Sequence, residues 1–253
     1  MRTPALAGAL LLVSLNAAAR ELSAQAPASP PVASAGMPSL NAGLLRPGTD
    51  KFAVYMVTGG RRELLARVTD EVSFVEVAPG DSAIRRVYQW ATGEETYSHV
   101  DTILVDRTTL TLRRHATSSA GVVTAVEWVA GRLSGNVRAN GKTTPVDAWL
   151  NAPVYHAGTL DLVARASILR RGYSATLSTF SPESGTIAPA ELSVTGLDSI
   201  GSPQWRVQSE VRGLLTTYWV DQRSHRIIRE ARYLGKGFRV EVVPVSTVAA
   251  TTR

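Results

Sequence analysis

The chain has 253 residues, a formal net charge of +6 and no cysteine. The lack of cysteine excludes disulfides, a thiol nucleophile and a lipid-modified N-terminal cysteine, so stability has to come from a hydrophobic core. The positive charge is modest, and arginine doublets such as Arg61-Arg62 and Arg113-Arg114 are spread along the chain, whereas a nucleic-acid-binding surface needs one basic patch. We therefore expect no nucleic-acid partner.

Residues 1–26 have the features of a secretory signal peptide. Arg2 precedes an apolar run from Ala5 to Leu15, and a small-residue stretch ending at Ala26 follows. The apolar run is too short for a helix that crosses a bilayer. We expect cleavage after Ala26, with Ala19 as the alternative, export to the periplasm or the extracellular space, and no membrane span in the mature form.

Residues 27–50 are rich in Pro, Ala and Ser, which predicts a disordered linker. From Lys51 onward, apolar and polar residues alternate in short segments, and turn signals such as Asn140-Gly141 and Ser184-Gly185 separate them. This pattern predicts a mainly β domain over residues 51–245, built as a curved antiparallel sheet that forms a half-barrel or open barrel. Residues 246–253 form a polar tail.

A strand-turn-strand sequence motif, called the repeated phrase below, occurs twice, at Asp101–Ala116 and Thr216–Ala231. The two copies divide the domain into repeats at about 51–150 and 151–245. Asp106 and Asp221 occupy equivalent places, each where a strand meets a turn. Because an aspartate at the start of a turn accepts hydrogen bonds from the following backbone, we interpret both as structural turn residues.

One segment departs from the strand pattern. Residues Thr159–Leu169 bring Leu160, Val163 and Ile168 to one face at helical spacing, which predicts one short amphipathic helix. Its apolar stripe has to pack on another surface, and the concave face of a curved sheet is the expected one.

No sequence motif indicates a catalytic or metal site. None of the four histidines lies in an H-x-H or H-E-x-x-H pair, and there is no G-x-S-x-G turn. His99 and Asp101 share a strand face and would support a zinc or acid-base site only if His156 or Asp106 approached. A polar strand surface is the simpler interpretation. We expect no catalytic residues, no metal and no cofactor; a hydrolase whose residues meet only in three dimensions is the less favoured alternative.

Three segments carry a resemblance to a known family: the helix TLDLVARASILRRGY, the strand AELSVTGLDSI and the terminal phrase YWVDQRSHRIIREARYL. They resemble domain-of-unknown-function family 3108, a group of exported β-rich proteins. The architecture also looks like the bacterial lipoprotein carriers and their outer-membrane receptors, in which a half-open barrel holds acyl chains against a helical lid. The resemblance implies a non-catalytic binding protein for a lipid or another apolar envelope ligand.

The expected ligand-binding residues are apolar side chains of the helix and of the later strands. They are Leu160, Val163, Ile168, Trp205, Val207, Trp219 and Phe238. Strand register decides which of them face inward, and the sequence leaves that register open. The alternative function is that of a structural adaptor, which would bind another envelope protein through an edge of the sheet.

Overall fold

The computed structural model describes residues 38–92, 97–119, 122–139, 141–182, 184–199 and 201–245, and the structural statements below refer to these ranges. The expected signal peptide, most of the linker and the polar tail lie outside the described residues. None of the helices in these ranges is long and apolar enough to span a bilayer.

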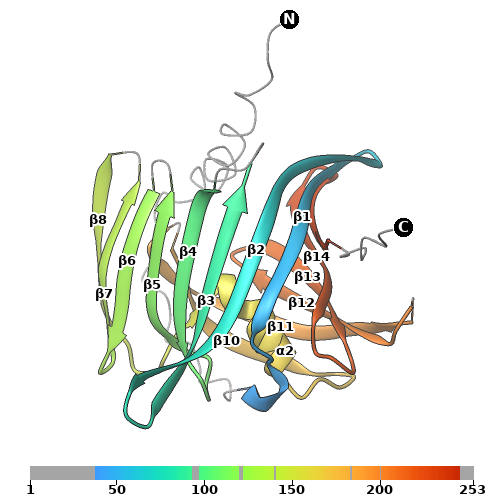
Figure 1. Cartoon of the computed structure of the whole chain (residues 1–253). Helices are drawn as coiled ribbons and strands as arrows, with labels where there is room; N and C mark the ends of the chain where they lie inside the picture. The colour runs from blue at the N-terminus through green and yellow to red at the C-terminus, as the bar shows by residue number, and fades with distance from the viewer. Residues whose placement is uncertain are drawn as a thin grey trace, which may run out of the picture. The chain divides into compact units, whose positions relative to one another are not determined.

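The described residues form fifteen strands in a single sheet, together with one short α-helix and two 3-10 turns (Figure 1). In the first half of the chain the elements are η1 (Ala42–Leu44), β1 (Gly48–Thr58), β2 (Arg61–Ala78), β3 (Asp81–Ala91), β4 (Tyr97–Asp106), β5 (Leu112–Ser119), β6 (Val122–Val129), β7 (Arg132–Ala139) and β8 (Lys142–Trp149). In the second half they are β9 (Tyr155–His156), η2 (Ala157–Thr159), α2 (Leu160–Ala166), β10 (Ser174–Ser181), β11 (Thr186–Asp198), β12 (Gln204–Val211), β13 (Leu214–Asp221), β14 (Ile227–Gly235) and β15 (Phe238–Pro244).

The sheet consists of two meanders joined at one seam. Its strand order is β8-β7-β6-β5-β4-β3-β2-β1-β15-β14-β13-β12-β11-β10-β9, so β1 and β15 meet in the middle. The pairs are antiparallel except β9 with β10, which run parallel because η2 and α2 connect them. The predicted fold class is confirmed: the chain is mainly β, with one open, curved sheet and one short helix.

Regular structure begins before Lys51, contrary to the prediction of a disordered linker up to residue 50. Leu40 forms a β-bridge with Ser167, and η1 follows directly. Leu45 is only 1% exposed and belongs to the main core. Burial of Leu45 and the packing of the partly buried Leu40 against the main core hold the segment on the domain, although the surrounding composition is typical of a linker.

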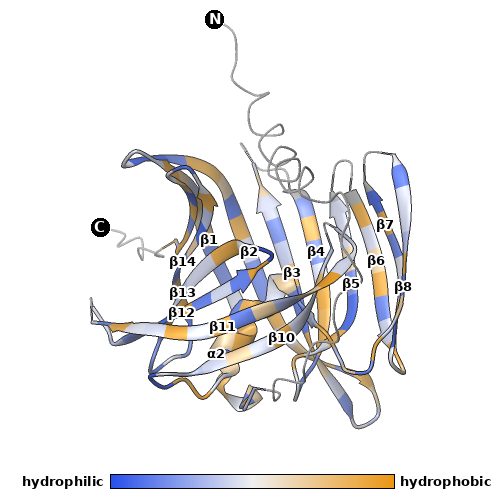
Figure 2. Ribbon diagram, turned by 180° about the vertical axis from the view of Figure 1, so that it is seen from behind, coloured by the Kyte–Doolittle hydropathy of each residue, from blue (hydrophilic) through white to orange (hydrophobic). Residues whose placement is uncertain are grey.

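The helix begins where the sequence predicts and ends earlier. All seven residues of α2 are buried. After Ala166 the backbone becomes extended at Ser167, whose hydroxyl donates to the Val163 carbonyl oxygen over 2.8 Å. Ile168 therefore lies beyond the helix. α2 lies on the inner side of the curved sheet, behind β10 and β11 in the view of Figure 2, where its ribbon is mostly coloured as hydrophobic.

Apolar side chains gather in two clusters on the inner face. The main cluster surrounds α2 and takes in residues of both meanders, among them Ile84, Leu112, Leu160, Val163 and Val207. The second cluster contains no residue of α2. Its buried members are Phe52, Val54, Ala66, Val68 and Val242, from β1, β2 and β15.

The two copies of the repeated phrase form hairpin turns with the same hydrogen bonds. Asp106 Oδ1 accepts from the backbone N–H groups of Thr108 and Thr109, over 2.9 and 2.8 Å. Asp221 Oδ1 accepts from the N–H groups two and three residues later over 3.1 and 2.7 Å. Each aspartate thus caps its turn with its own side chain.

The fourth residue after each aspartate has the same backbone conformation in the two copies. Leu110 and His225 have φ of 58° and 53°, in the left-handed region that few non-glycine residues adopt. Their N–H groups donate to the carbonyl oxygens of Asp106 and Asp221, over 2.9 and 3.0 Å. The sequence repeat therefore corresponds to a repeat of backbone geometry.

Replacing either aspartate by alanine should lower the free energy of unfolding by about 1–2 kcal/mol, because backbone donors of the turn lose their acceptor. Urea denaturation of Asp106→Ala and Asp221→Ala measures the loss. Thr108→Ala is the control, since Thr108 contributes its backbone N–H to the turn, and it should change stability by less than about 0.5 kcal/mol. An aspartate variant as stable as this control would contradict the capping role.

Candidate functional site

A row of polar residues crosses the inner face of the sheet. Asp70 on β2, Tyr88 on β3, Asp101 on β4 and Thr117 on β5 stand side by side in register. Side chains alternate between faces along a strand, so these four share the face that carries Ile84 of the main core. Buried polar groups cost free energy unless they are paired. This row and its partners are therefore the candidate functional site.

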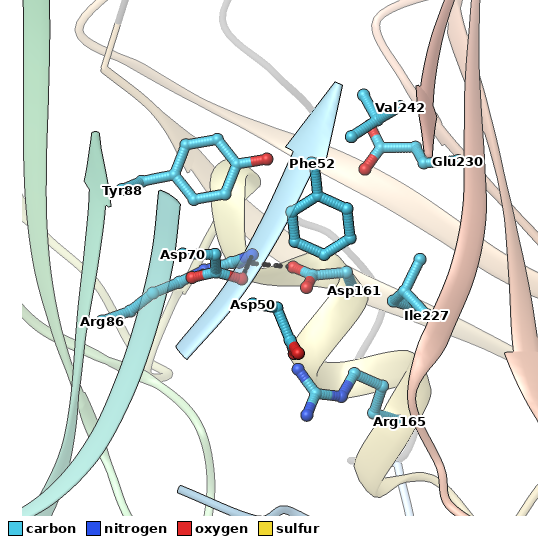
Figure 3. A pocket seen from close by; sticks show the side chains of 10 residues that line it. All are labelled: Asp50, Phe52, Asp70, Arg86, Tyr88, Asp161, Arg165, Ile227, Glu230 and Val242. Carbon is cyan, nitrogen blue, oxygen red and sulfur yellow. Dashed lines mark hydrogen bonds and ion pairs between the residues drawn. The ribbon is translucent and has the colours of Figure 1, made fainter. Parts of the chain in front are cut away.

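One part of the site is a charge network centred on Arg86 of β3 (Figure 3). Its guanidinium donates to both carboxylate oxygens of Asp70, over 2.8 and 2.7 Å. One terminal nitrogen also donates to Asp161 of α2 over 2.6 Å and to the Gly158 carbonyl oxygen over 2.9 Å. The exposed fraction is 6% for Arg86 and 4% for Asp70.

This network joins the helix to the sheet. Burial alone would lower the pKa of Arg86, but Asp161 and Asp70 raise it well above its ordinary value. The guanidinium therefore stays charged, and its donors are used by groups of the protein itself. Its contribution is the placement of α2 against β2 and β3.

The space beside the network is small. The cavity has a volume of about 10 Å³, enough for about one water molecule. It is lined by Asp50, Phe52, Asp70, Arg86, Tyr88, Asp161, Arg165, Ile227, Glu230 and Val242 (Figure 3). Burial raises the pKa of Tyr88 and that of Glu230, and it lowers the pKa of Arg165. A ligand larger than water does not fit here without movement of side chains.

The other part of the site is a group of histidines around Asp101. The Asp101 carboxylate is 2.6 Å from His99 Nε2 and 3.1 Å from His115 Nε2. The ring of His156 packs against that of His115, with 4.4 Å between ring centroids. Asp106 instead caps its turn. Among the described residues no three His, Cys, Asp or Glu side chains are placed to hold a metal ion.

These groups do not form a catalytic triad. The Thr117 hydroxyl is 3.5 Å from His99 Nε2, the same ring nitrogen that meets Asp101. In a triad the carboxylate binds one imidazole nitrogen and the nucleophilic hydroxyl binds the other. The Thr117 hydroxyl also donates to the Val100 carbonyl oxygen, over 3.3 Å. His99 is therefore not placed to activate it.

The surroundings of His156 favour its neutral form. Burial, together with the charges of His115 and Arg86, holds its pKa well below the ordinary value. Its Nδ1 accepts the Gly158 N–H over 3.0 Å, so its proton lies on Nε2. That Nε2 and the Nδ1 of His115 have no hydrogen-bond partner among the described residues.

The structure separates the seven residues expected to bind a ligand. Leu160, Val163 and Val207 are at most 1% exposed, and Trp205 packs against the same main cluster. These four lie together, but other side chains of the protein fill the space around them. The apolar side chains Leu160 and Val163 of α2 are therefore part of the hydrophobic core.

The other three lie elsewhere. Trp219 alternates with the inward residues Tyr218 and Val220, so it lies on the outer face, where its Nε1–H donates to Asp198 over 2.7 Å. Ile168 is 57% exposed beyond the helix. Phe238 is 43% exposed and shares the face of Val240 and Val242 on β15.

The second cluster of the inner face has a buried centre and a partly exposed margin, and we call the two together the open apolar patch. It consists of the second cluster with the partly buried side chains around it: Phe52, Val54, Leu65, Ala66, Val68, Tyr88, Trp90, Val240 and Val242. Tyr88 and Trp90 meet edge to face at 5.8 Å between centroids. Alternation at Phe52 and Val54 and at Val240 and Val242 is visible in the sequence. The pairing of β1 with β15 is not visible in the sequence, and sequence reasoning therefore missed this surface.

Comparisons with known proteins identify no family for the chain. No family model and no curated protein matches it, so membership of family 3108 is not shown. A β-barrel-like protein of domain of unknown function DUF1849 from Brucella abortus is 12% identical, with a TM-score of 0.49 over 82% of this chain and 98% of that one. A DUF1329 family protein from Desulfovibrio piger is 6% identical, with a TM-score of 0.30 over 78% and 83% of the two chains. At these values the similarity does not extend to a function.

Removing the centre of the charge network should destabilise the protein strongly. Arg86→Ala leaves Asp70 and Asp161 buried without their partner, so we expect a loss of about 3–5 kcal/mol in urea denaturation. The neighbouring Arg85→Ala is the matched control, because the Arg85 ion pair with Glu71 is exposed and should contribute at most about 1 kcal/mol. Equal effects of the two variants would show that the network is not structural.

Stability should fall as the pH drops from 7 to 5. Below about pH 6.5 the unfolded chain protonates His156, whereas the folded protein keeps it neutral, so acid favours unfolding by up to about 1.4 kcal/mol per pH unit. The pKa of Asp101 is also lowered, since hydrogen bonds from His115 and His99 outweigh the effect of burial. Its contribution is lost only below about pH 4, outside this window. Urea midpoints of the wild type and of His156→Asn test the assignment, and an equally steep decline in the variant would contradict it.

Proposed function

We propose that this protein is an exported, non-catalytic binding protein that holds an apolar ligand, such as an acyl chain, on the open apolar patch. The observation that carries the proposal is the division of the inner face into two clusters, of which only one includes α2. The apolar run after Arg2 supports export. The resemblance to lipoprotein carriers supports an apolar ligand.

The dimensions of the elements explain why part of the inner face stays open. A helix of seven residues is about 10 Å long, whereas a strand of eleven residues such as β1 extends for about 37 Å. α2 packs on β13 and on the two 3-10 turns. One short helix cannot cover the whole concave side of such strands. The partly buried side chains of the patch, Leu65, Tyr88, Trp90 and Val240, offer contact to another apolar group.

The chemistry of the patch fits a chain-like apolar ligand. Aromatic rings of Tyr88 and Trp90 stand beside aliphatic side chains, as in most small-molecule sites. The charge network around Arg86 lies at the boundary with the helix, since Arg86 and Tyr88 are inward neighbours on β3. The buried Arg86 pairs are not available to a ligand, so apolar contact would provide most of the affinity.

The sheet-edge adaptor is the second candidate, favoured by the position of β8 at one end of the sheet. Trp149 of this strand is 73% exposed. However, β8 also contains Pro145, which lacks an N–H donor, and Lys142. Both residue types oppose pairing at a free edge. We therefore place the binding function first.

The decisive experiment measures binding of a long-chain fatty acid that carries bromine atoms, which quench tryptophan fluorescence on contact. We expect a dissociation constant in the micromolar range, which corresponds to a binding free energy of about −8 kcal/mol. The probe should quench the tryptophan fluorescence of Trp90→Phe less than that of the wild type. Val240→Glu should weaken binding at least tenfold, because it places a charge in the patch.

Val123→Glu is the matched control: Val123 is 47% exposed on β6, in the opposite meander, and this variant should bind like the wild type. Native mass spectrometry of protein purified from its own envelope should find a co-purifying lipid. Failure of the probe to bind, together with a co-purifying protein, would favour the adaptor function instead.

A further inference from the structure

A basic groove lies on the domain where η1 meets the turn between β13 and β14. Its volume is about 380 Å³, and its lining consists of Leu44, Arg46, Arg223, Ser224, His225 and Arg226. We propose that this groove binds a phosphate group. The site is separate from the open apolar patch, and it does not depend on the proposed function.

The charges of the groove are largely uncompensated. Arg46 and Arg223 are exposed, and neither guanidinium forms an ion pair with the described residues. Arg226 is paired, with 3.2 Å between its guanidinium and Asp50. The carboxylate of Asp221 is turned into its own loop, where Oδ1 accepts from the turn and Oδ2 accepts from Ser202. An anion entering the groove therefore meets at least two unpaired guanidinium groups.

The other copy of the repeated turn shows that cations at these positions are not needed for the turn geometry. The turn after Asp106 has the same backbone hydrogen bonds and the same left-handed fourth residue. Its positions equivalent to Arg223, His225 and Arg226 hold Thr108, Leu110 and Thr111. The first turn has its own cations, since Arg107 follows Asp106 and Arg113 pairs with the Asp106 carboxylate over 2.6 Å, but the turn geometry does not need them at the three groove positions. The cations at those positions in the second copy therefore require another explanation.

The turn that lines the groove is hydrogen-bonded to α2. His225 Nδ1 donates to the Arg165 carbonyl oxygen over 2.9 Å, and Arg165 Nε donates to the His225 carbonyl oxygen over 3.0 Å. This reciprocal pair ties the turn to α2. Since Arg165 is only 5% exposed, the turn is held by a buried anchor, and the cationic side chains beside it are presented from a fixed backbone.

Phosphate is the anion that suits this arrangement. Guanidinium groups form paired, charge-assisted hydrogen bonds to phosphate oxygens, and several of them can surround one phosphate, which has more acceptor atoms than a carboxylate. The groove is larger than one phosphate ion and falls within the size range of small-molecule sites. The phosphate could be free in solution or could be the headgroup of an anionic lipid.

Calorimetric titration with inorganic phosphate at low salt tests the site. The pocket variant is Arg46→Gln with Arg223→Thr, in which the second change copies the residue of the first turn and spares the Arg226 ion pair. We expect its affinity for phosphate to be at least tenfold lower than that of the wild type. The control is Arg114→Gln with Arg138→Gln, two exposed arginines on β5 and β7, and it should stay within twofold.

Co-sedimentation with phosphatidylglycerol vesicles, against phosphatidylcholine vesicles, distinguishes the two sources of phosphate. Binding that is lost in the pocket variant and kept in the control supports the proposal in either arm: free phosphate indicates a soluble ligand, and phosphatidylglycerol alone indicates a lipid headgroup. Equal binding by the two variants, or no binding in both arms, overturns it. Fatty-acid binding should be unchanged in the pocket variant. The phosphate site can therefore fail its test while fatty-acid binding to the apolar patch is confirmed, and the patch can fail its test while the phosphate site is confirmed.

Discussion

The pairing of β1 with β15 is the constraint on which the rest of the domain depends. The other antiparallel pairs join strands that follow one another in the chain, whereas this pair brings together its two ends, from Phe52 opposite Pro244 to Thr58 opposite Phe238. Closing so long a loop costs conformational entropy before any contact forms. The apolar contacts across the seam, such as Val54 with Val242, offset part of that cost. The seam joins the two meanders into one sheet, adds Val242 of β15 to the second cluster and accompanies the ion pair of Asp50 with Arg226.

The helix completes the inside of the sheet and is oriented by charge as well as by apolar contact. A helix with apolar side chains on most of its surface can pack in several rotations of similar energy. The contacts of Asp161 with Arg86 and of Arg165 with His225 select the rotation seen in the structure. The core therefore contains charges whose value lies in placing the helix, because a buried ion pair adds little net stability over apolar packing but is costly to break.

The two copies of the turn show which residues the backbone geometry requires and which side chains are free to differ. Both copies keep the aspartate and the left-handed fourth residue, since these satisfy the turn's own N–H groups. The hydroxyl three residues after the aspartate is also kept, as Thr109 and Ser224. The fourth residue differs: Leu110 is fully buried in the main core, whereas His225 lines a groove together with arginines. The same loop thus serves as a core element in one meander and as a charged surface in the other, in keeping with the general independence of fold and site.

The sequence by itself determined the local features of this protein. Period-two alternation, the regular turn residues and the helical spacing from Leu160 depend on neighbours in the chain, and they predicted the curved antiparallel sheet and its single helix. The tertiary structure decided which residues meet. The structure places Trp219 of β13 on the outer face and Trp205 of β12 on the inner face. A shift of one residue in either strand would reverse the face of its tryptophan, and composition does not reveal that register. Arg86, Asp161 and the histidines around Asp101 come from strands and a helix far apart in sequence, so no motif spacing connects them. Burial of Leu45 likewise ordered a segment whose composition alone is typical of a linker, because apolar contact with a distant core outweighs local preference.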